Sequence, residues 1–304
     1  MTESPTGAQH EIVHGEHRAV VTELGAGLRT YEVGGRAVVD GYGADETPAS
    51  GRGQVLVPWP NRVDGGRYTF AGTEHQLPIT EVGKGNASHG LLRWVAWQVQ
   101  TADDGASTTS RYVLRPQPGY PFTVEVTLVH ALDDDGLTVT ATLRNVGTGP
   151  APVGMGFHPY VAIGAPHVDD VELTLPAGRY SDVDERGIPG AAHDVVGSAF
   201  DFTSPRPVGD TVLDTPFTDL RRDDDGRWRV RVGRPDGSAV TVWGDETYGH
   251  LQVFTADAWS GGAPRSAIAV EPMTCPPNAF VTGEGRVVLE PGAALTGSWG
   301  LTPS

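Results

Sequence analysis

The sequence predicts an all-β protein that consists of many short strands. Apolar and polar residues alternate with a period of two in several segments, and no long segment repeats apolar residues at the three- and four-residue spacing of a helix. The 304 residues also include 41 glycines and 24 prolines, which favour turns and interrupt helices. Together these observations favour short strands joined by tight connections.

The clearest predicted hairpin lies in the first half of the chain. Residues 120–129 and 136–146 both alternate apolar side chains with threonine or charged residues, and the acidic run at residues 133–136 ends in glycine between them. A period of two puts alternate side chains on opposite faces of a strand. We therefore expect an antiparallel pair with one buried and one solvated face.

A second hairpin is predicted from residues 228–232 and 240–242, which are joined by a Pro-Asp-Gly turn at residues 235–237. Its first strand alternates apolar side chains with arginines, and we expect this arginine stripe to face solvent. Residues 111–114 and 287–289 are typical of further strands.

Composition is uniform along the chain, so we expect a single domain over residues 11–304. Residues 1–10 are polar and are expected to be loose, and the turn-rich residues 162–210 are expected to hold long connections. The N-terminus has no apolar segment typical of a signal peptide. No stretch approaches the roughly 18–20 apolar residues of a membrane span.

The formal net charge of −16 at pH 7 argues against nucleic acid or an anionic membrane as a partner, because both attract cations. We expect a soluble, cytoplasmic monomer or homodimer. Cys275 is the only cysteine, so no internal disulfide and no cysteine cluster for a metal can form. The acidic runs at residues 133–136 and 223–226 lack the ligand spacing of a calcium loop and are predicted turns.

Four segments each hold one polar side chain in a stiff local frame. Glu271 precedes a proline, which predicts an extended backbone at the end of a strand. His158 lies among glycine, proline and aromatic residues, His89 precedes a glycine, and Arg62 ends the segment Pro-Trp-Pro-Asn-Arg. A carboxylate, two imidazoles and a guanidinium are groups that can move protons on a neutral polyol.

Taken singly, each of these side chains is more typical of a structural residue, such as a surface glutamate or a histidine with local hydrogen bonds. No His-Glu-x-x-His helix, phosphate loop or Gly-x-Ser-x-Gly turn occurs. Ser88 and His89 do not suggest a triad, because adjacent residues on a strand point to opposite faces.

The ordered set of motifs resembles the aldose 1-epimerase (galactose mutarotase) family along most of the chain. The resemblance implies a large antiparallel β-sandwich, the galactose mutarotase-like supersandwich. Residues 214–220 and 271–280 are most similar to a bacterial branch that acts on aldohexoses or related sugars. The motifs are Pro-Trp-Pro-Asn-Arg-Val at 58–63, Gly-Arg-Tyr-Thr-Phe-Ala-Gly at 66–72, Leu-Pro at 77–78, Ser-His-Gly at 88–90, Trp94, Trp97, Gly-Phe-His-Pro-Tyr at 156–160, Leu-Gln-Val-Phe-Thr at 251–255 and Val-Glu-Pro at 270–272.

To open a cyclic sugar, a proton must leave the C1 hydroxyl and another must reach the ring oxygen. Glu271 suits the base, because a carboxyl with an unperturbed pKa of about 4.3 is ionised at neutral pH. His158 suits the acid, because imidazole titrates near pH 6.5 and a neighbouring carboxylate would raise its pKa. The resemblance implies the same two roles, and the chemistry requires neither a metal nor a redox cofactor.

The remaining candidates are expected to hold the sugar. Arg62 and His89 would position it and polarise its oxygens, with Asn61 beside Arg62 in the same motif. The resemblance implies that Asp214 accepts a hydrogen bond from a sugar hydroxyl.

For three further residues the alternatives stay open. Gln252 matches a sugar-facing glutamine of the family, or it is an ordinary strand amide. Trp59 and Trp259 either stack on the apolar face of the sugar or are packed residues of the core or the rim.

The resulting hypothesis is an aldose 1-epimerase that acts on a free aldohexose such as glucose or galactose. A phosphorylated sugar would require a cationic pocket, for which Arg52 and Arg93 are the nearest extra candidates, and a sulfonated or otherwise modified sugar is a further alternative. A sugar-binding module without turnover is a third, although such a module needs no matched base and acid. A glycoside hydrolase or lyase usually needs two carboxylates, and Asp214 would be the only partner for Glu271.

Overall fold

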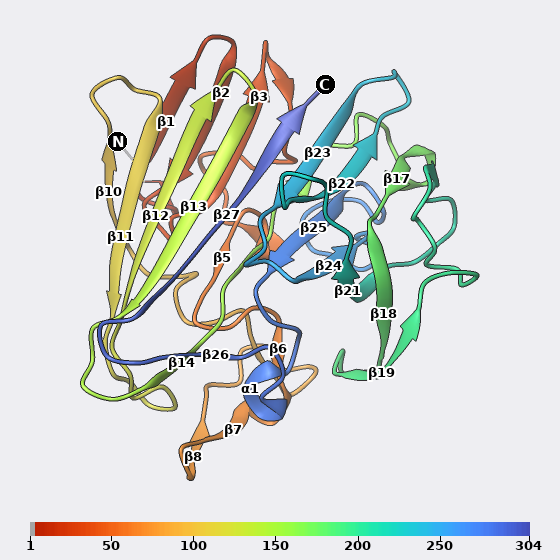
Figure 1. Ribbon diagram of the computed structural model, residues 1–304. Helices are drawn as coiled ribbons and strands as arrows, with labels where there is room; N and C mark the ends of the chain where they lie inside the picture. The colour runs from red at the N-terminus through yellow and green to blue at the C-terminus, as the bar shows by residue number, and fades with distance from the viewer. Residues whose placement is uncertain (1–3) are drawn as a thin grey trace.

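The computed structural model describes residues 4–304, and nearly all of its regular structure is β (Figure 1). Two large antiparallel sheets face each other, and short strands gather near one end of them. The described chain holds one α-helix, the single turn α1 (Ala279–Thr282). The all-β prediction is therefore confirmed.

The first large sheet has nine strands in the order β10-β11-β12-β13-β27-β23-β22-β17-β20. Its longest hairpin pairs β12 (Val124–Asp133) with β13 (Gly136–Asn145) in register along both strands. The other strands are β10 (Gln98–Thr101), β11 (Ser107–Leu114), β27 (Ala294–Pro303), β23 (Ala239–Gly244), β22 (Trp228–Gly233), β17 (Glu172–Thr174) and β20 (Arg206–Pro207).

The second large sheet has the order β19-β18-β21-β24-β25-β15-β5, and β16 also pairs with β25. Strand β25 (Ile268–Met273) lies inside this sheet, so both of its edges are hydrogen-bonded. The other strands are β19 (Pro189–Asp194), β18 (Ala177–Val183), β21 (Asp214–Leu220), β24 (His250–Phe254), β15 (Gly156–Phe157), β5 (Val55–Leu56) and β16 (Tyr160–Val161).

Smaller sheets complete the fold. One has four strands, β1 (Gln9–His14), β2 (His17–Thr22), β3 (Leu28–Val33) and β4 (Arg36–Ala37). Three two-stranded sheets pair β14 (Ala151–Val153) with β26 (Val287–Leu289), β6 (Arg62–Val63) with β9 (Ala87–Ser88), and β7 (Arg67–Phe70) with β8 (Thr73–Gln76). The 3₁₀ turns are η1 (Ala49–Gly51), η2 (Asp64–Gly66) and η3 (Val168–Asp170).

The core lies between the two large sheets. On β12 the buried side chains Val124, Val126 and Leu128 alternate with more exposed threonine and glutamate, which is the predicted pattern of one buried face. From the opposite sheet, Phe157 packs on Trp299 of β27 with ring centroids 5.1 Å apart. Each fully buried valine or leucine contributes about 1.5–3 kcal/mol to folding. Two facing antiparallel sheets confirm the predicted sandwich.

Both predicted hairpins are confirmed, and the two acidic runs form turns. Asp133 Oδ1 accepts hydrogen bonds from the backbone N–H groups of Asp135 and Gly136, as short aspartate turns do. Arg229 of the predicted solvated stripe pairs with Asp223 and Asp225 at the surface. Residues 162–210, expected to be long connections, instead include the strands β17 to β20.

The structured chain begins before the predicted boundary at residue 11. Strand β1 starts at Gln9, whose side-chain amide donates to Thr6 Oγ1 at 2.9 Å, and Thr6 is fully buried. Ser4 Oγ donates to the carbonyl of Ala44 at 2.6 Å. These hydrogen bonds hold a segment whose polar composition suggested a loose terminus, and residues 1–3 lie outside the described residues.

Within residues 4–304, no helix combines the length and apolar character needed to cross a membrane.

Candidate active site

A cavity of about 590 Å³ brings together six of the eight predicted site residues. Catalytic candidates Glu271 and His158 both line it, and so do four of the predicted sugar-binding residues. These four sugar-binding candidates are Asn61, Arg62, His89 and Asp214. The other two, Gln252 and Trp59, do not line the cavity.

Glu271 lies inside strand β25, so the prediction that it ends its strand is wrong. The strand continues through Pro272, which is in register with Leu251 of β24, to Met273. All six residues of β25 are buried, and Glu271 is 2% exposed. A central strand confines the carboxylate more tightly than a strand end would, because neighbouring strands hold its backbone on both sides.

His158 directly follows β15 and faces Glu271. Its Nε2 lies 3.4 Å from Glu271 Oε1, and its ring stacks on Tyr160 with centroids 5.0 Å apart. On another side, a Cβ atom at Gly51 would be 2.6 Å from the His158 ring, so a glycine is required at that position. The imidazole is therefore confined by packing as well as by its partner.

Burial pushes the protonation of this pair toward the uncharged forms. Desolvation, with Arg93 and Arg62 as further causes, lowers the pKa of His158 to about 3. Desolvation, followed by the charge of Asp214, raises the pKa of Glu271 well above its ordinary value, and Arg62 opposes this shift. The prediction that a neighbouring carboxylate would raise the pKa of His158 is wrong, because loss of solvent outweighs that attraction.

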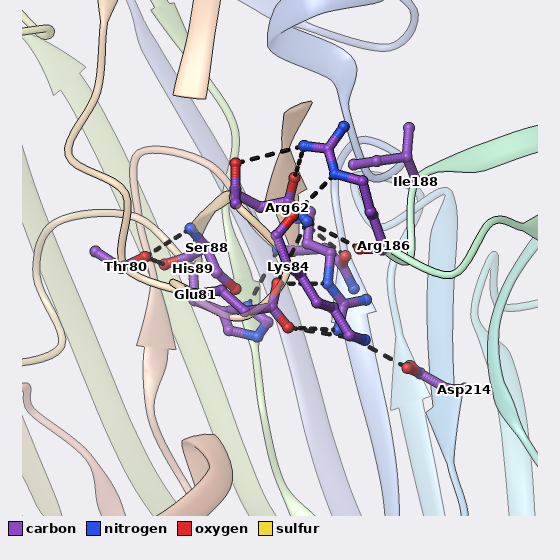
Figure 2. A network of polar contacts seen from close by, with 12 residues as sticks. Arg62, Thr80, Glu81, Lys84, Ser88, His89, Arg186, Ile188 and Asp214 are labelled. Carbon is purple, nitrogen blue, oxygen red and sulfur yellow. Dashed lines mark hydrogen bonds and ion pairs between the residues drawn. The ribbon is translucent and has the colours of Figure 1, made fainter. Parts of the chain in front are cut away.

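Arg62 is held by two carboxylates (Figure 2). Its Nε and Nη2 donate to the two carboxylate oxygens of Glu81 at 2.8 and 3.1 Å, a bidentate arrangement that fixes the plane of the guanidinium. Its Nη2 also lies 3.8 Å from Asp214 Oδ2. Arg62 thus points between Glu81 and the carboxylate predicted to bind the sugar.

Gln252 does not line the cavity but contacts Asp214, which does. Its Nε2 donates to Asp214 Oδ1 at 2.7 Å, across the pairing of β24 with β21. Gln252 is buried and contacts Asp214, and its direct contact with the sugar stays a prediction.

His89 has a defined tautomer. Its Nδ1 accepts a hydrogen bond from the Asn61 backbone N–H at 3.2 Å, so in the neutral ring the proton lies on Nε2. Burial, and then the charge of Arg93, lowers the pKa of His89 well below its ordinary value, which keeps the ring neutral. Asn61 in turn uses its Oδ1 to accept the backbone N–H of Arg62 at 2.9 Å.

The two tryptophans left open by the sequence do not line the cavity. Trp59 is buried and packs against Phe280 with ring centroids 5.6 Å apart, so its alternative as a core residue is the correct one. Trp259 stacks on Tyr160, and the guanidinium of Arg52 lies over it. Trp259 thus supports the wall behind His158.

The other residues that line the cavity include Glu81 and Trp94, which the sequence did not assign to the site, and Arg93, which it offered only for a phosphorylated sugar. Glu81 has no motif around it, and its role depends on a contact with Arg62, which is 19 residues away in sequence. Arg93 donates to Gln54 Oε1 at 3.1 Å, and burial lowers its pKa to about 10. Trp94 is 53% exposed, and its place in a family-like motif was its only signal.

In the part of the chain that the structure describes, no group of three His, Cys, Asp or Glu side chains is arranged to hold a metal ion. Cys275 is buried, and desolvation raises the pKa of its thiol to about 12, which fits the predicted packing role.

The known proteins to which the chain is similar share this fold. The chain is similar in structure to a putative aldose 1-epimerase from Escherichia coli K12, with a TM-score of 0.83 and 22% identity over 98% of this chain and 99% of that one. A GalM/aldose epimerase homologue from Caenorhabditis elegans has a TM-score of 0.85 and 17% identity, with 98% of each chain covered.

In sequence, the chain is 34% identical over 289 residues to the uncharacterized protein YihR of Escherichia coli K12, which covers 94% of this chain and 90% of that protein. It is also 34% identical over 164 residues to rat galactose mutarotase, but this match covers 52% of this chain and 46% of the rat protein. Residues 9–302 match the family model described as aldose 1-epimerase. On this match, the chain belongs to the aldose 1-epimerase family.

Proposed function

We propose that the protein is an aldose 1-epimerase that interconverts the α and β anomers of a free aldohexose such as glucose or galactose. Family membership supports the broader statement that it is an isomerase acting on carbohydrates. The observation that carries the proposal is the buried pair of Glu271 and His158, 3.4 Å apart in a cavity bordered by hydroxyl-binding groups.

Glu271 takes the proton of the C1 hydroxyl while His158 gives a proton to the ring oxygen. The C1–O5 bond breaks, the aldehyde forms, and rotation about C1–C2 exposes its other face. Closure reverses both transfers and gives the other anomer. Each positioned group contributes about 10²–10⁴-fold to the rate.

The pKa shifts support these roles. A raised pKa makes the Glu271 carboxylate a stronger base, and a lowered pKa makes the His158 imidazolium a stronger acid. Ring opening converts a charged pair into protonated Glu271 and neutral His158, the forms that burial favours. The same burial disfavours the charged, reactive pair in the free protein.

Three groups are proposed to hold the sugar. Arg62 and the Nε2–H of His89 donate to its oxygens, and Asp214 accepts from a hydroxyl group. Four acidic and three basic side chains line the cavity, so it has no excess of cations for a phosphate group, which supports a neutral sugar as the substrate. The name of the rat relative, galactose mutarotase, supports a hexose.

The test is the relaxation of freshly dissolved α-D-glucose and α-D-galactose toward anomeric equilibrium, followed by polarimetry or proton NMR. Faster relaxation with the protein is the expected result for at least one of the two sugars. If neither sugar relaxes faster, but a phosphorylated or sulfonated hexose does, the substrate class is wrong. If none does, a sugar-binding module becomes the better interpretation.

A cytoplasmic location, which rests on composition, and a monomeric or homodimeric state are further proposals.

A further inference from the structure

The turn between β18 and β19, residues 184–188, lies behind Arg62 without lining the cavity. Gly187 has φ +74°, and a Cβ atom there would be 2.5 Å from Arg62 Nη1 and 2.7 Å from Cζ. The turn therefore approaches the guanidinium more closely than any residue with a side chain could.

Arg186 fastens this turn to the loop that carries Glu81 (Figure 2). Its Nε donates to the carbonyl of Lys84 and its Nη2 to Asn86 Oδ1, both at 2.9 Å, while Nη1 lies 2.7 Å from Asp64 Oδ1. Asn86 Nδ2 donates back to the carbonyl of Arg186 at 2.8 Å. The turn and the loop are thus joined by reciprocal hydrogen bonds.

The turn and the loop are each also stabilised by hydrogen bonds of their own. In the turn, Asp184 Oδ1 accepts the N–H groups of Arg186 and Ile188 at 2.9 and 2.8 Å. In the loop, the Glu81 carbonyl accepts the N–H of Gly85 at 2.8 Å, and the Glu81 N–H donates to Asn86 at 3.0 Å. Neither segment depends on the sugar for its shape.

We propose that residues 184–188 are a positioning element of the active site, in which Gly187 and Glu81 together confine the guanidinium of Arg62. Arginine has many rotamers, and a side chain that is ordered before binding loses less entropy when the sugar arrives. We therefore expect the confinement of Arg62 to lower the KM for the sugar. This inference rests on the proposed function, which gives Arg62 its contact with the sugar.

The test variant is Gly187→Ala, and Gly197→Ala is its matched control. Gly197 has φ +77°, so alanine meets the same backbone strain there, but no heavy atom lies within 4 Å of the added Cβ. At Gly187 the colliding group is the end of a long side chain, so the guanidinium moves more easily than the backbone. We expect Gly187→Ala to raise the KM about tenfold, the effect of weakening one hydrogen bond to a charged group, with kcat within about twofold. Gly197→Ala should leave both constants unchanged.

Combining Gly187→Ala with Arg62→Ala distinguishes an effect that acts through Arg62 from a general loss of structure. If Gly187 acts through Arg62, the double variant has the kinetic constants of Arg62→Ala alone. An unchanged KM in Gly187→Ala, an equal effect of Gly197→Ala, or a further rise of KM in the double variant would each overturn the proposal.

A second readout needs no sugar. The Arg62 Nε–H resonance, identified by its loss in Arg62→Lys, should shift and exchange faster with solvent in Gly187→Ala and stay unchanged in Gly197→Ala. Arg186→Lys, which keeps a positive charge near Asp64 but loses the fork of donors, should shift it in the same way if Gly187→Ala does not fold. If the resonance moves as expected while no sugar is turned over, the proposed function fails and the positioning role stands. If it does not move, the positioning role is wrong.

Discussion

Glu271 Oε1 and His158 Nε2 lie 3.4 Å apart, and neither residue is more than 5% exposed. Desolvation raises the pKa of the first and lowers that of the second, so burial shifts the pair toward a protonated carboxyl and a neutral imidazole. In the proposed reaction, a protonated Glu271 and a neutral His158 are the forms present after the sugar ring has opened, whereas the ring-closed complex reacts from the charged forms. In the proposed reaction, burial would therefore favour ring opening at both ends of the C1–O5 unit.

Glu271→Gln should reduce turnover by at least about 10²-fold while sugar binding changes little. The amide keeps the shape and a hydrogen-bonding oxygen but cannot take up the hydroxyl proton. Anomer relaxation measures the rate, and titration of the sugar followed by NMR measures the affinity. Glu125→Gln, on β12 in the other large sheet, is the control. A near-normal rate in Glu271→Gln would show that another group is the base.

His158→Asn and His89→Asn should have different kinetic effects. The first removes the proton donor and should lower kcat by at least about 10²-fold. The second removes a hydrogen-bond donor and should act mainly on KM, and asparagine tolerates the left-handed backbone at this position, where φ is +60°. Steady-state kinetics of both variants separate the roles, and a larger loss of kcat in His89→Asn would reverse the assignment.

The sequence was sufficient to predict the strands that have one buried and one solvent-exposed face. The alternation on β12 and β13 reflects a sheet with solvent on one side, so periodicity locates the hairpin. It does not locate the ends of β25, because all six of its residues are buried and no alternation marks where the strand stops. Pro272 suggested that the strand ends at Glu271, but β25 continues through Pro272 to Met273.

The residues that line the candidate site were predictable where a motif frames them, as at Glu271, His158 and Arg62. They were not predictable where the role depends on a contact between distant segments. Glu81 reaches Arg62 from a loop without a motif, and no local pattern distinguishes the buried Trp59 from the exposed Trp94. The direction of the pKa shift of His158 was missed for a related reason, because desolvation depends on the whole surrounding fold.

Trp59→Ala should lower the free energy of unfolding by about 3–5 kcal/mol, the usual cost of removing a large buried aromatic side chain. Trp94→Ala should change it by no more than about 0.5 kcal/mol, because Trp94 is largely solvated. Chemical denaturation measures both. Trp59→Phe, which keeps part of the packing against Phe280, should leave the KM unchanged. An increased KM in this variant would restore Trp59 as a sugar-binding residue.

Protein stability should fall in acid partly because of His130, which is buried in the core and has no part in the proposed chemistry. Desolvation lowers its pKa to about 4, below the value near 6.5 expected in the unfolded chain. Between these values the unfolded state binds more protons, so the free energy of unfolding decreases as the pH falls from about 6.5 toward 4. The contribution of His130 to this loss is roughly 3 kcal/mol between pH 7.5 and pH 4. Denaturation of the parent protein and of His130→Gln at both pH values should show a smaller loss in the variant by about this amount, and equal losses would show that His130 does not titrate differently on unfolding.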